Sequence, residues 1–296
     1  MGLDAVIVSD PALIEICSTY APGLNIHLST QASATNVETF HFWKQYGLTR
    51  VVLAREVTME ELAEIRKRTD LEIEAFVHGA MCISYSGRCT LSNHMSDRDA
   101  NRGGCSQSFR WKYDLYDMPF GQERKSIHGE VPEEYSMSAV DMCMIENIPD
   151  LIDNGVDSLK IEGRMKKPEY VAAVTAMYRK YTDLYMQNGK KGYKVSSEDK
   201  RILMDLYNRG GFSAGYYRQH NGQNMIASDR PNHAGVPAVK VESQKGRLIK
   251  GKILTDLHAG DVLDISGSYT IGKDQKKGEA FSMVVQKQVY INRDRQ

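Results

Sequence analysis

The first two thirds of the chain alternate short β-branched runs with amphipathic stretches, and this alternation constrains the fold more than any other feature. Six runs rich in Val, Ile and Leu are typical of strands, at residues 4–9, 25–29, 50–54, 71–76, 138–144 and 157–163. Helical patterns lie at residues 11–20, 37–47, 58–69, 148–155 and 167–189. Strand–helix alternation with short turns predicts right-handed crossovers and parallel strands. We therefore predict an α/β fold with strands covered on both faces.

Residue types at the predicted helix ends agree with this pattern. Thr58 and Glu61 have the spacing of a capping box, in which each side chain binds a free backbone N–H of the other. Gly47, Gly155 and Gly189 stand where three helices should end. These signals predict helices with defined boundaries between the strands.

The character of the chain changes after about residue 195. Residues 196–217 indicate a short helix followed by a Gly-rich turn. Four strand-like runs follow at residues 237–243, 247–254, 262–267 and 279–291, with Lys, Gly and Asp at their turns. This pattern is typical of a small β-rich domain. We therefore predict one domain over residues 1–192 and a second, a helix–turn and then a β-rich domain, over residues 193–296.

Four cysteines form the most specific candidate for a site. Cys82, Cys89 and Cys105 lie in or beside a long loop at residues 77–137, and Cys143 lies in the next predicted strand. Zinc fingers favour paired Cys-x2–4-Cys knuckles, which this spacing lacks, whereas an iron–sulfur cluster needs only four thiolates. The spacing leaves zinc, an iron–sulfur cluster and small buried residues open as interpretations. Cys17, within an amphipathic helix, is interpreted as a core residue.

Composition excludes several classes of function. The chain of 296 residues carries 38 basic and 38 acidic side chains, so its net charge does not indicate bulk binding to nucleic acid or to an anionic membrane. No apolar run approaches the roughly 20 residues of a membrane span. The first residues lack the features of a signal peptide, and five cysteines are an odd and sparse set for a disulfide framework. We expect a cytoplasmic protein without membrane association.

Polar and charged side chains recur where successive predicted strands end. They are His27, Ser29, Gln31, Arg55, Glu56, Glu74, His78, Lys160, Glu162 and Arg164. Such recurrence is typical of an active site at the carboxyl end of an α/β barrel. His27 and Glu162 are the candidate general bases. Arg55, Lys160 and Arg164 suit a dicarboxylate, and salt bridges such as Arg55 with Glu74 are the structural alternative.

Residues 74–92, EAFVHGAMCISYSGRCTLS, resemble the signature segment of the collagenase-like peptidase family U32. Supporting similarities lie at residues 27–36, 51–58, 102–113 and 158–171, so the resemblance covers residues 1–190. The later segments RGGFSAGYY and DRPNHAGVPAVKV resemble the domain that follows the barrel in long members of the family. Those members include a bacterial enzyme that hydroxylates a cytidine of large-subunit ribosomal RNA.

The resemblance carries expectations for fold and cofactor. It implies a TIM-like barrel that lacks its first two βα units here, which accounts for six visible units. In relatives that act in oxygen-independent ubiquinone hydroxylation, four cysteines of this pattern hold a 4Fe-4S cluster. The four matching positions here are Cys82, Cys89, Cys105 and Cys143, so the resemblance favours iron–sulfur over zinc. Related RNA hydroxylases resemble enzymes that depend on prephenate, a small dicarboxylate. The resemblance therefore implies an RNA hydroxylase that acts on rRNA or tRNA and uses such a dicarboxylate as co-substrate.

Two alternatives remain open from the sequence. A peptidase is the first, but the chain has no HExxH and no GxSxG motif. Its only sequence-local nucleophile and base would be Cys82 with His78, and the resemblance assigns Cys82 to the cluster.

The second alternative is an inactive, truncated binding module. Basic side chains of the tail would then dock RNA or protein, unless they are solvated lysines that protect sheet edges. They are Lys240, Lys245, Arg247, Lys250 and Lys252.

Overall fold

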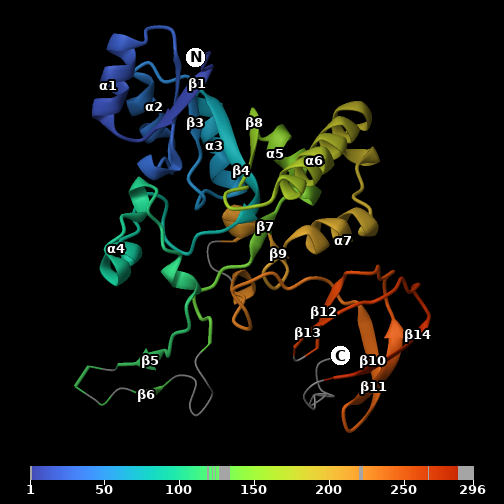
Figure 1. Cartoon of the computed structure of the whole chain (residues 1–296). Coiled ribbons are helices and arrows are strands. Elements are labelled where there is room, and N and C mark those ends of the chain that lie inside the picture. Colours follow the sequence, from blue (N-terminus) through green and yellow to red (C-terminus); the bar gives the residue numbers. More distant parts are fainter. Residues whose placement is uncertain are drawn as a thin grey trace. The chain divides into compact units, whose positions relative to one another are not determined.

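The structure is a computed structural model, and it divides into two compact units (Figure 1). It describes residues 2–118, 120–121, 123, 125–126, 134–219, 223–265 and 267–285. The units are Met1–Ala234 and Gly235–Gln296, and each is described by itself.

Four parallel strands begin the sheet of the first unit, joined by helices as the alternation predicts. In spatial order these strands are β1 (Ala5–Val8), β2 (Asn25–Leu28), β3 (Arg50–Val52) and β4 (Glu72–Ala80). The helices between them are α1 (Pro11–Tyr20), α2 (Val37–Lys44) and α3 (Met59–Arg68). Parallel neighbours need crossover connections of this kind, so the first half of the predicted pattern is confirmed.

The sheet becomes mixed at β4. The strand β8 (Ser158–Ile161) pairs parallel with the first part of β4, and β7 (Asp141–Cys143) pairs antiparallel with its last residues. The short β9 (Phe212–Ser213) pairs parallel with β7. The prediction of a wholly parallel sheet is therefore wrong at β7. The chain enters that strand from the long loop and not through a crossover helix.

The mixed α/β class is confirmed, and the six predicted strands are all present. Within the described residues β1 pairs only with β2, and β8 only with β4, so these strands form an open sheet. The TIM-like barrel lacking two units stays a prediction.

The first unit contains further helices beyond those between its first four strands. Its further helices are α4 (Leu91–Ser96), α5 (Ile148–Asp153), α6 (Pro168–Asn188) and α7 (Ser197–Leu206). Its single-turn 3-10 helices are η1 (Thr30–Ala32), η2 (Ala100–Arg102), η3 (Ser108–Arg110), η4 (Ile145–Asn147), η5 (Lys190–Gly192), η6 (Gly215–Arg218) and η7 (Gln223–Met225). Within the predicted loop, β5 (Tyr116–Asp117) pairs with β6 (Lys125–Ser126), and residues 119, 122, 124 and 127–133 lie outside the described residues.

Local capping fixes the helix boundaries as predicted. Thr58 and Glu61 form both hydrogen bonds of the capping box at the start of α3. Gly155 has φ 81° after α5, and a Cβ at this position would overlap the side chain of Arg66. Glycine is therefore required there for both conformation and space.

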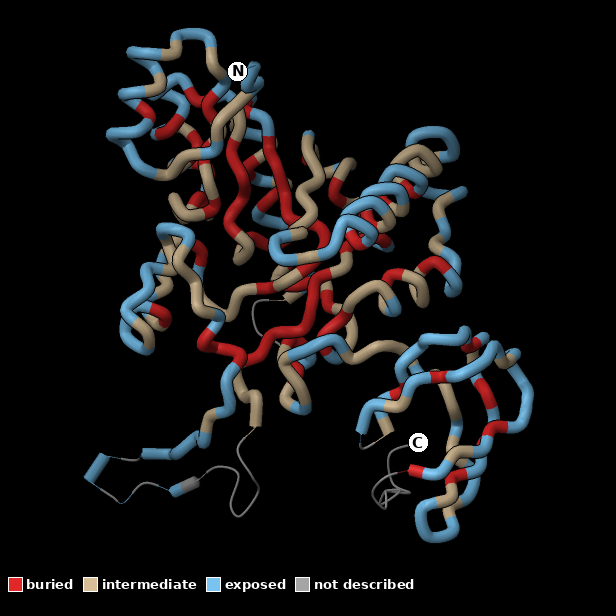
Figure 2. The backbone as a smooth tube through the Cα atoms, in the orientation of Figure 1, coloured by how far each residue is buried: buried red, intermediate tan, exposed pale blue. Residues whose placement is uncertain are grey.

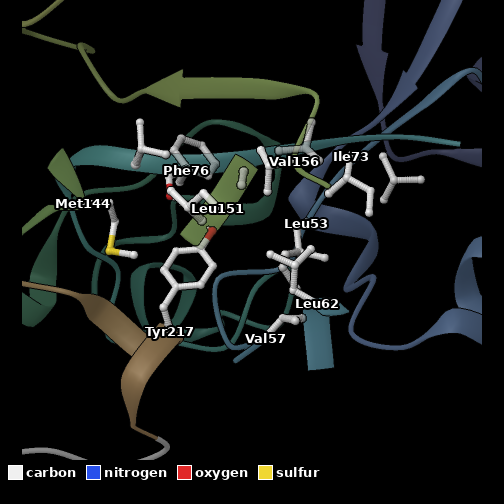
Figure 3. Close-up of a cluster of buried hydrophobic side chains, with 14 of the residues drawn as sticks. Leu53, Val57, Leu62, Ile73, Phe76, Met144, Leu151, Val156 and Tyr217 are labelled. Carbon is white, nitrogen blue, oxygen red and sulfur yellow. Dashed lines mark hydrogen bonds between the residues drawn. The ribbon is translucent and has the colours of Figure 1, made fainter. Parts of the chain in front are cut away.

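The core of the first unit lies against the central strands. Figure 2 shows buried stretches along β3, β4 and β7, and every residue of β4 from Ile73 to Gly79 is buried. Figure 3 shows Phe76 beside Leu151 and Met144, with the ring of Tyr217 below them. The Tyr217 hydroxyl donates to the Phe76 carbonyl at 3.3 Å. Cys17 is partly buried and packs against this core, in agreement with its predicted role.

Helix α7 and the turn after it belong to the first unit. Lys180 and Tyr181 of α6 both donate to the Asp199 carboxylate of α7 at 2.6 Å. Arg209, beyond α7, pairs with Asp141 of β7 at 2.6 Å. These contacts attach α7 and Arg209 to the first unit, which ends at Ala234. The sequence pattern predicted a boundary at residues 192 and 193.

The second unit consists of antiparallel strands, as predicted for a β-rich domain. A three-stranded sheet has β11 (Leu248–Ile253) between β10 (Val239–Lys245) and β14 (Ala280–Val284), and β12 (Val262–Asp264) pairs with β13 (Ser268–Thr270). Its core consists of Ile253, Leu257, Leu263, Ile271 and Phe281. Residues 286–291 of the predicted last strand lie outside the described residues.

All five basic side chains singled out in the tail are exposed. Lys250 and Lys252 lie on the central strand β11, and Lys240 and Lys245 lie on the neighbouring strand β10. Protection of a sheet edge can therefore explain the lysines of β10 and not those of β11.

Candidate functional site

A cavity of about 1280 Å³ lies in the first unit where β4 and β8 end. Its wall contains seven basic side chains and two acidic ones. The basic ones are Arg55, Arg98, Arg110, Arg164, Lys166, Lys167 and Arg209, and the acidic ones are Glu162 and Glu169. A wall with this excess of positive charge attracts anions.

Two glycines allow the segments around the cavity to approach one another. At Gly79, near the end of β4, a Cβ would overlap the carbonyl oxygen of Glu162, and φ is 108°. At Gly87 a Cβ would overlap the carbonyl oxygen of Gln31, and φ is 73°. The loop after β4 therefore packs on η1, and the residues after β8 pack on β4.

Three of the four predicted cysteine ligands line this cavity. They are Cys82, Cys89 and Cys105. Asn101 holds the Cys89 backbone by accepting from its N–H at 3.3 Å and donating to its carbonyl oxygen at 2.9 Å. The Gln107 N–H donates to the Cys105 sulfur at 3.3 Å. Burial raises the pKa of the Cys82 thiol.

Cys143 is the fourth predicted ligand. It ends β7, pairs in register with His78 of β4 and does not line the cavity. The Tyr178 hydroxyl contacts its sulfur at 3.9 Å, and burial raises the pKa of its thiol to about 11. In the part of the chain that the structure describes, no three Cys, His, Asp or Glu side chains are placed to hold a metal ion. The metal or iron–sulfur cluster predicted for the four cysteines stays a prediction.

Four further predicted site residues also line the cavity. They are Gln31, Arg55, Glu162 and Arg164. The Arg55 guanidinium lies 4.3 Å from the centre of the Phe76 ring, a cation–π contact. The Glu162 carboxylate accepts from the Arg164 backbone N–H at 2.8 Å, and the Arg164 side chain donates to the Gly103 carbonyl at 3.2 Å.

Ser29 and Glu56 lie behind the cavity wall and position it. The Ser29 hydroxyl caps η1 by accepting from the Gln31 N–H at 3.2 Å. The Glu56 carboxylate accepts from the Ser86 N–H at 2.9 Å, which anchors the loop after β4.

Glu74, Lys160 and His27 belong to a different cluster on the sheet. Glu74 is 7% exposed and accepts from Lys160 at 2.8 Å, from Ser158 at 3.1 Å and from Arg50 at 3.2 Å. Burial opposes ionisation of Glu74, but the hydrogen bond from Lys160 and its charge outweigh burial and lower the pKa. Burial and the charge of Arg50 lower the pKa of His27. Glu74 thus pairs with Lys160 and Arg50, and not with Arg55.

His78 is enclosed by aromatic rings and does not line the cavity. It is 2% exposed, and the ring centres of Tyr170, Tyr178 and Phe212 lie 5.4–6.1 Å from its own. Burial lowers its pKa to about 4. Cys82 lines the cavity and His78 does not, so the nucleophile and base of a cysteine peptidase are not assembled from this pair.

The sequence patterns missed the basic residues at the base of the cavity. Arg110 and Arg209 are each 7% exposed, and Lys166 lies over the ring of Tyr207. The Tyr207 ring stacks on His233 with centres 5.1 Å apart. Burial and then the charge of Arg209 lower the pKa of Lys166 to about 7. These residues come from separate segments without strand or helix periodicity. The signal that could have found the three basic residues is the family resemblance, whose segments at residues 102–113, 158–171 and 209–217 contain them.

No helix among the described residues is both long enough and apolar enough to cross a membrane. The predicted cytoplasmic location stays a prediction.

Several curated proteins are similar to this chain over much of its length. A "tRNA hydroxylation protein P1" of Bacillus subtilis is 54% identical over 180 residues, which cover 61% of this chain and 42% of that protein. A "tRNA hydroxylation protein P" of Escherichia coli is 33% identical over 312 residues, covering 90% of this chain and 67% of that protein. The "23S rRNA 5-hydroxycytidine C2501 synthase" of Escherichia coli is 34% identical over 269 residues, covering 89% of this chain and 39% of that protein.

The chain spans about half the length of the curated relatives it matches. The model of the family described as "Peptidase family U32" matches residues 1–227, which include the whole cavity wall apart from His233. The predicted family resemblance is thereby confirmed, and the chain belongs to peptidase family U32.

Proposed function

We propose that this chain is the substrate-binding and catalytic part of a hydroxylase that modifies a nucleotide of tRNA or rRNA. The observation that carries the proposal is the cavity wall, which combines seven basic side chains with the rings of Tyr85, Phe109, Tyr170 and Tyr207. Proteins that read single RNA bases stack them on aromatic rings and bind their phosphates with Arg and Lys. The names of the relatives, two for tRNA hydroxylation and one for 23S rRNA hydroxycytidine synthesis, support the same class of reaction.

Glu162 is the proposed general acid–base residue. Its carboxylate lies on the cavity wall and is oriented by the Arg164 N–H. His27, the other candidate, lies in the cluster of Arg50 and Glu74, whose charges affect its pKa. A group that transfers a proton must reach the substrate, so the cavity favours Glu162.

Arg55 and Arg164 are the proposed anchors for a small dicarboxylate such as prephenate. Both guanidinium groups line the cavity. Lys160, the third predicted anchor, already pairs with Glu74 at 2.8 Å. We therefore propose two of the three predicted side chains for this role, since an ion pair neutralises the third.

A 4Fe-4S cluster, with zinc as the alternative, remains a proposal for the cysteines. Cys82, Cys89 and Cys105 line one cavity, and Cys143 at the end of β7 does not line it. These four thiolates would hold the cluster. Anaerobic reconstitution with iron and sulfide, read by visible absorption and metal analysis, tests the cluster. We expect its loss in Cys89→Ala; a colourless protein with bound zinc would contradict it.

Nucleoside mass spectrometry of a host that lacks this chain tests the hydroxylase. We expect one hydroxylated nucleoside of tRNA or rRNA to disappear, and to return with the wild-type chain but not with Glu162→Gln. Glu64→Gln is the matched control, because Glu64 pairs with Lys67 on the exposed face of α3. An unchanged nucleoside spectrum in the host lacking this chain would contradict the proposal. The collagenase-like peptidase reading gains no support from the geometry.

A further inference from the structure

The base of the cavity carries more positive charge than the protein neutralises. Arg110, Lys166 and Arg209 all line the cavity, and the charges of both arginines act on Lys166. Asp141 is the buried carboxylate among them, and it pairs with Arg209 at 2.6 Å. Glu162, the other carboxylate whose charge acts on Lys166, is held by a backbone N–H. We call Arg110, Asp141, Lys166 and Arg209 the basic floor.

Arg110 is buried with neutral partners only. Its guanidinium donates to the Ser138 hydroxyl at 2.9 Å, the Ala139 carbonyl at 3.0 Å and the Met81 carbonyl at 3.4 Å. Its Nε has no hydrogen-bond acceptor among the described residues. Burial and the charge of Arg209 lower its pKa to about 10. The Asp141 carboxylate acts on Arg110 but pairs with Arg209. A buried cation with so little counter-charge is costly unless a ligand supplies more.

Backbone strain places Lys166 at the same floor. Met165, just before it, has φ 64° and is 90% exposed, an unusual combination for a large apolar residue. The turn sends Met165 to solvent and brings the Lys166 amine over the ring of Tyr207. Within the described residues Lys166 forms no ion pair, in contrast to Lys160 on the preceding strand.

We propose that Arg110, Lys166 and Arg209 form an oxyanion subsite that takes one carboxylate or phosphate group of a ligand. A guanidinium suits a group with two oxygens, and an ammonium adds a point charge beside it. The inference rests on the proposed function, because the group would belong either to the small acid or to the RNA backbone. It differs from the predicted anchors, since none of these three residues was among them.

Calorimetric titration at low salt and at about pH 6.5, with sulfate and separately with malonate as probes, tests the subsite. We expect Lys166→Met to weaken binding by about tenfold, the loss of one charge-assisted contact. We expect Asp141→Asn to tighten binding by a few fold, because the amide retains an acceptor for Arg209 and removes the competing negative charge. Lys191→Met, at an exposed lysine of η5, is the control and should bind as wild type.

A second readout is independent of whether Asp141→Asn folds. The groups that face Lys166 are Arg110, Asp141, Glu162 and Arg209, together with the rings of Tyr170 and Tyr207. Sulfate keeps its charge between about pH 6 and about pH 8, so tighter binding at the lower pH reports protonation of a group of the cavity wall. Lys166→Met should abolish this dependence.

The outcomes separate the subsite from the proposed function. Preference for sulfate assigns the subsite to an RNA phosphate, and preference for malonate assigns it to the small acid. Absence of binding by the wild-type chain, or equal affinity in Lys166→Met, overturns the subsite even if RNA modification is intact. Anion binding without any change in host RNA would contradict the hydroxylase and leave the subsite standing.

Discussion

Two charged clusters in the first unit are built from the same kinds of residue and differ in their balance of charge. In the sheet network, Glu74 pairs with Arg50 and Lys160, and Arg50 also pairs with Glu72 at 2.7 Å. Two cations thus meet two carboxylates. In the basic floor, Arg110, Lys166 and Arg209 meet the single buried carboxylate of Asp141.

The difference distinguishes an ion network that supports the sheet from the proposed anion subsite. The Arg50 and Lys160 side chains of the sheet network are each 25% exposed, so water also stabilises their charges. The arginines of the basic floor are 7% exposed and border a cavity. Perturbed, unbalanced charges in a cavity are typical of functional sites, whereas balanced ones are usual in structural networks.

The strongest test of the comparison is Asp141→Ala. Removing this carboxylate leaves Arg209 and Arg110 buried without any counter-charge, and we expect the free energy of unfolding to fall by about 3–5 kcal/mol. Urea denaturation measures the loss. Added sulfate should restore part of it, because an anion on the floor replaces the missing charge. A loss below about 1 kcal/mol, with no effect of sulfate, would show that unbalanced charge in the basic floor does not affect the free energy of unfolding.

Glu74→Ala should have a smaller effect that sulfate does not reverse. We expect a loss of about 2 kcal/mol, because Arg50 and Lys160 keep contact with water and Arg50 keeps Glu72.

The pH dependence of unfolding sharpens the prediction for Glu74. Its folded pKa lies below the ordinary value, so its contribution is present above the ordinary glutamate pKa and is lost as the pH falls through the folded value. Glu74→Ala should remove this acid-dependent part of the unfolding free energy. An unaltered pH profile in the variant would count against the network.

Lys166→Met should act in the opposite direction and stabilise the fold. The folded pKa of Lys166 is about 7, below the ordinary lysine value of 10.5, so the unfolded chain binds the proton more tightly. The protonated lysine therefore costs stability below about pH 7, and this cost fades as the pH rises towards 10.5. Because the side chain is half-exposed, solvent screening reduces the expected gain at neutral pH to about 1 kcal/mol.

Thermal or urea unfolding over a pH series measures this gain, which should vanish at high pH. Lys167→Met is the matched control. Lys167 follows Lys166 in the chain, is exposed and has no ion-pair partner among the described residues. Destabilisation by Lys166→Met at neutral pH would show that the charges of the basic floor are balanced in the folded protein.

Residue patterns predicted the parts of this protein that depend on neighbours in the chain. The strands at residues 4–9 and 50–54, the capping box of Thr58 and the glycine stop at Gly155 follow from local periodicity and backbone conformation. The alternation also predicted that Arg55 and Glu162 would lie at one edge of the sheet, and both line the cavity.

Other features depended on contacts between distant segments. The reversal of β7 follows from the path of the long loop, and it places Cys143 opposite His78. The same reversal brings Asp141 to Arg209, 68 residues later in the chain.

The sequence by itself determined the α/β class, the six strands, the β-rich second unit and the family, because each is carried by local patterns or by contiguous motifs. Only the tertiary structure decided which charges are balanced. The basic residues of both clusters lie beside strands or turns. No periodicity in the sequence distinguishes Arg50 and Lys160 from Arg110 and Arg209. Their difference arises from the carboxylates that folding places within hydrogen-bond distance, and Coulomb energy depends on that distance and on burial rather than on separation along the chain.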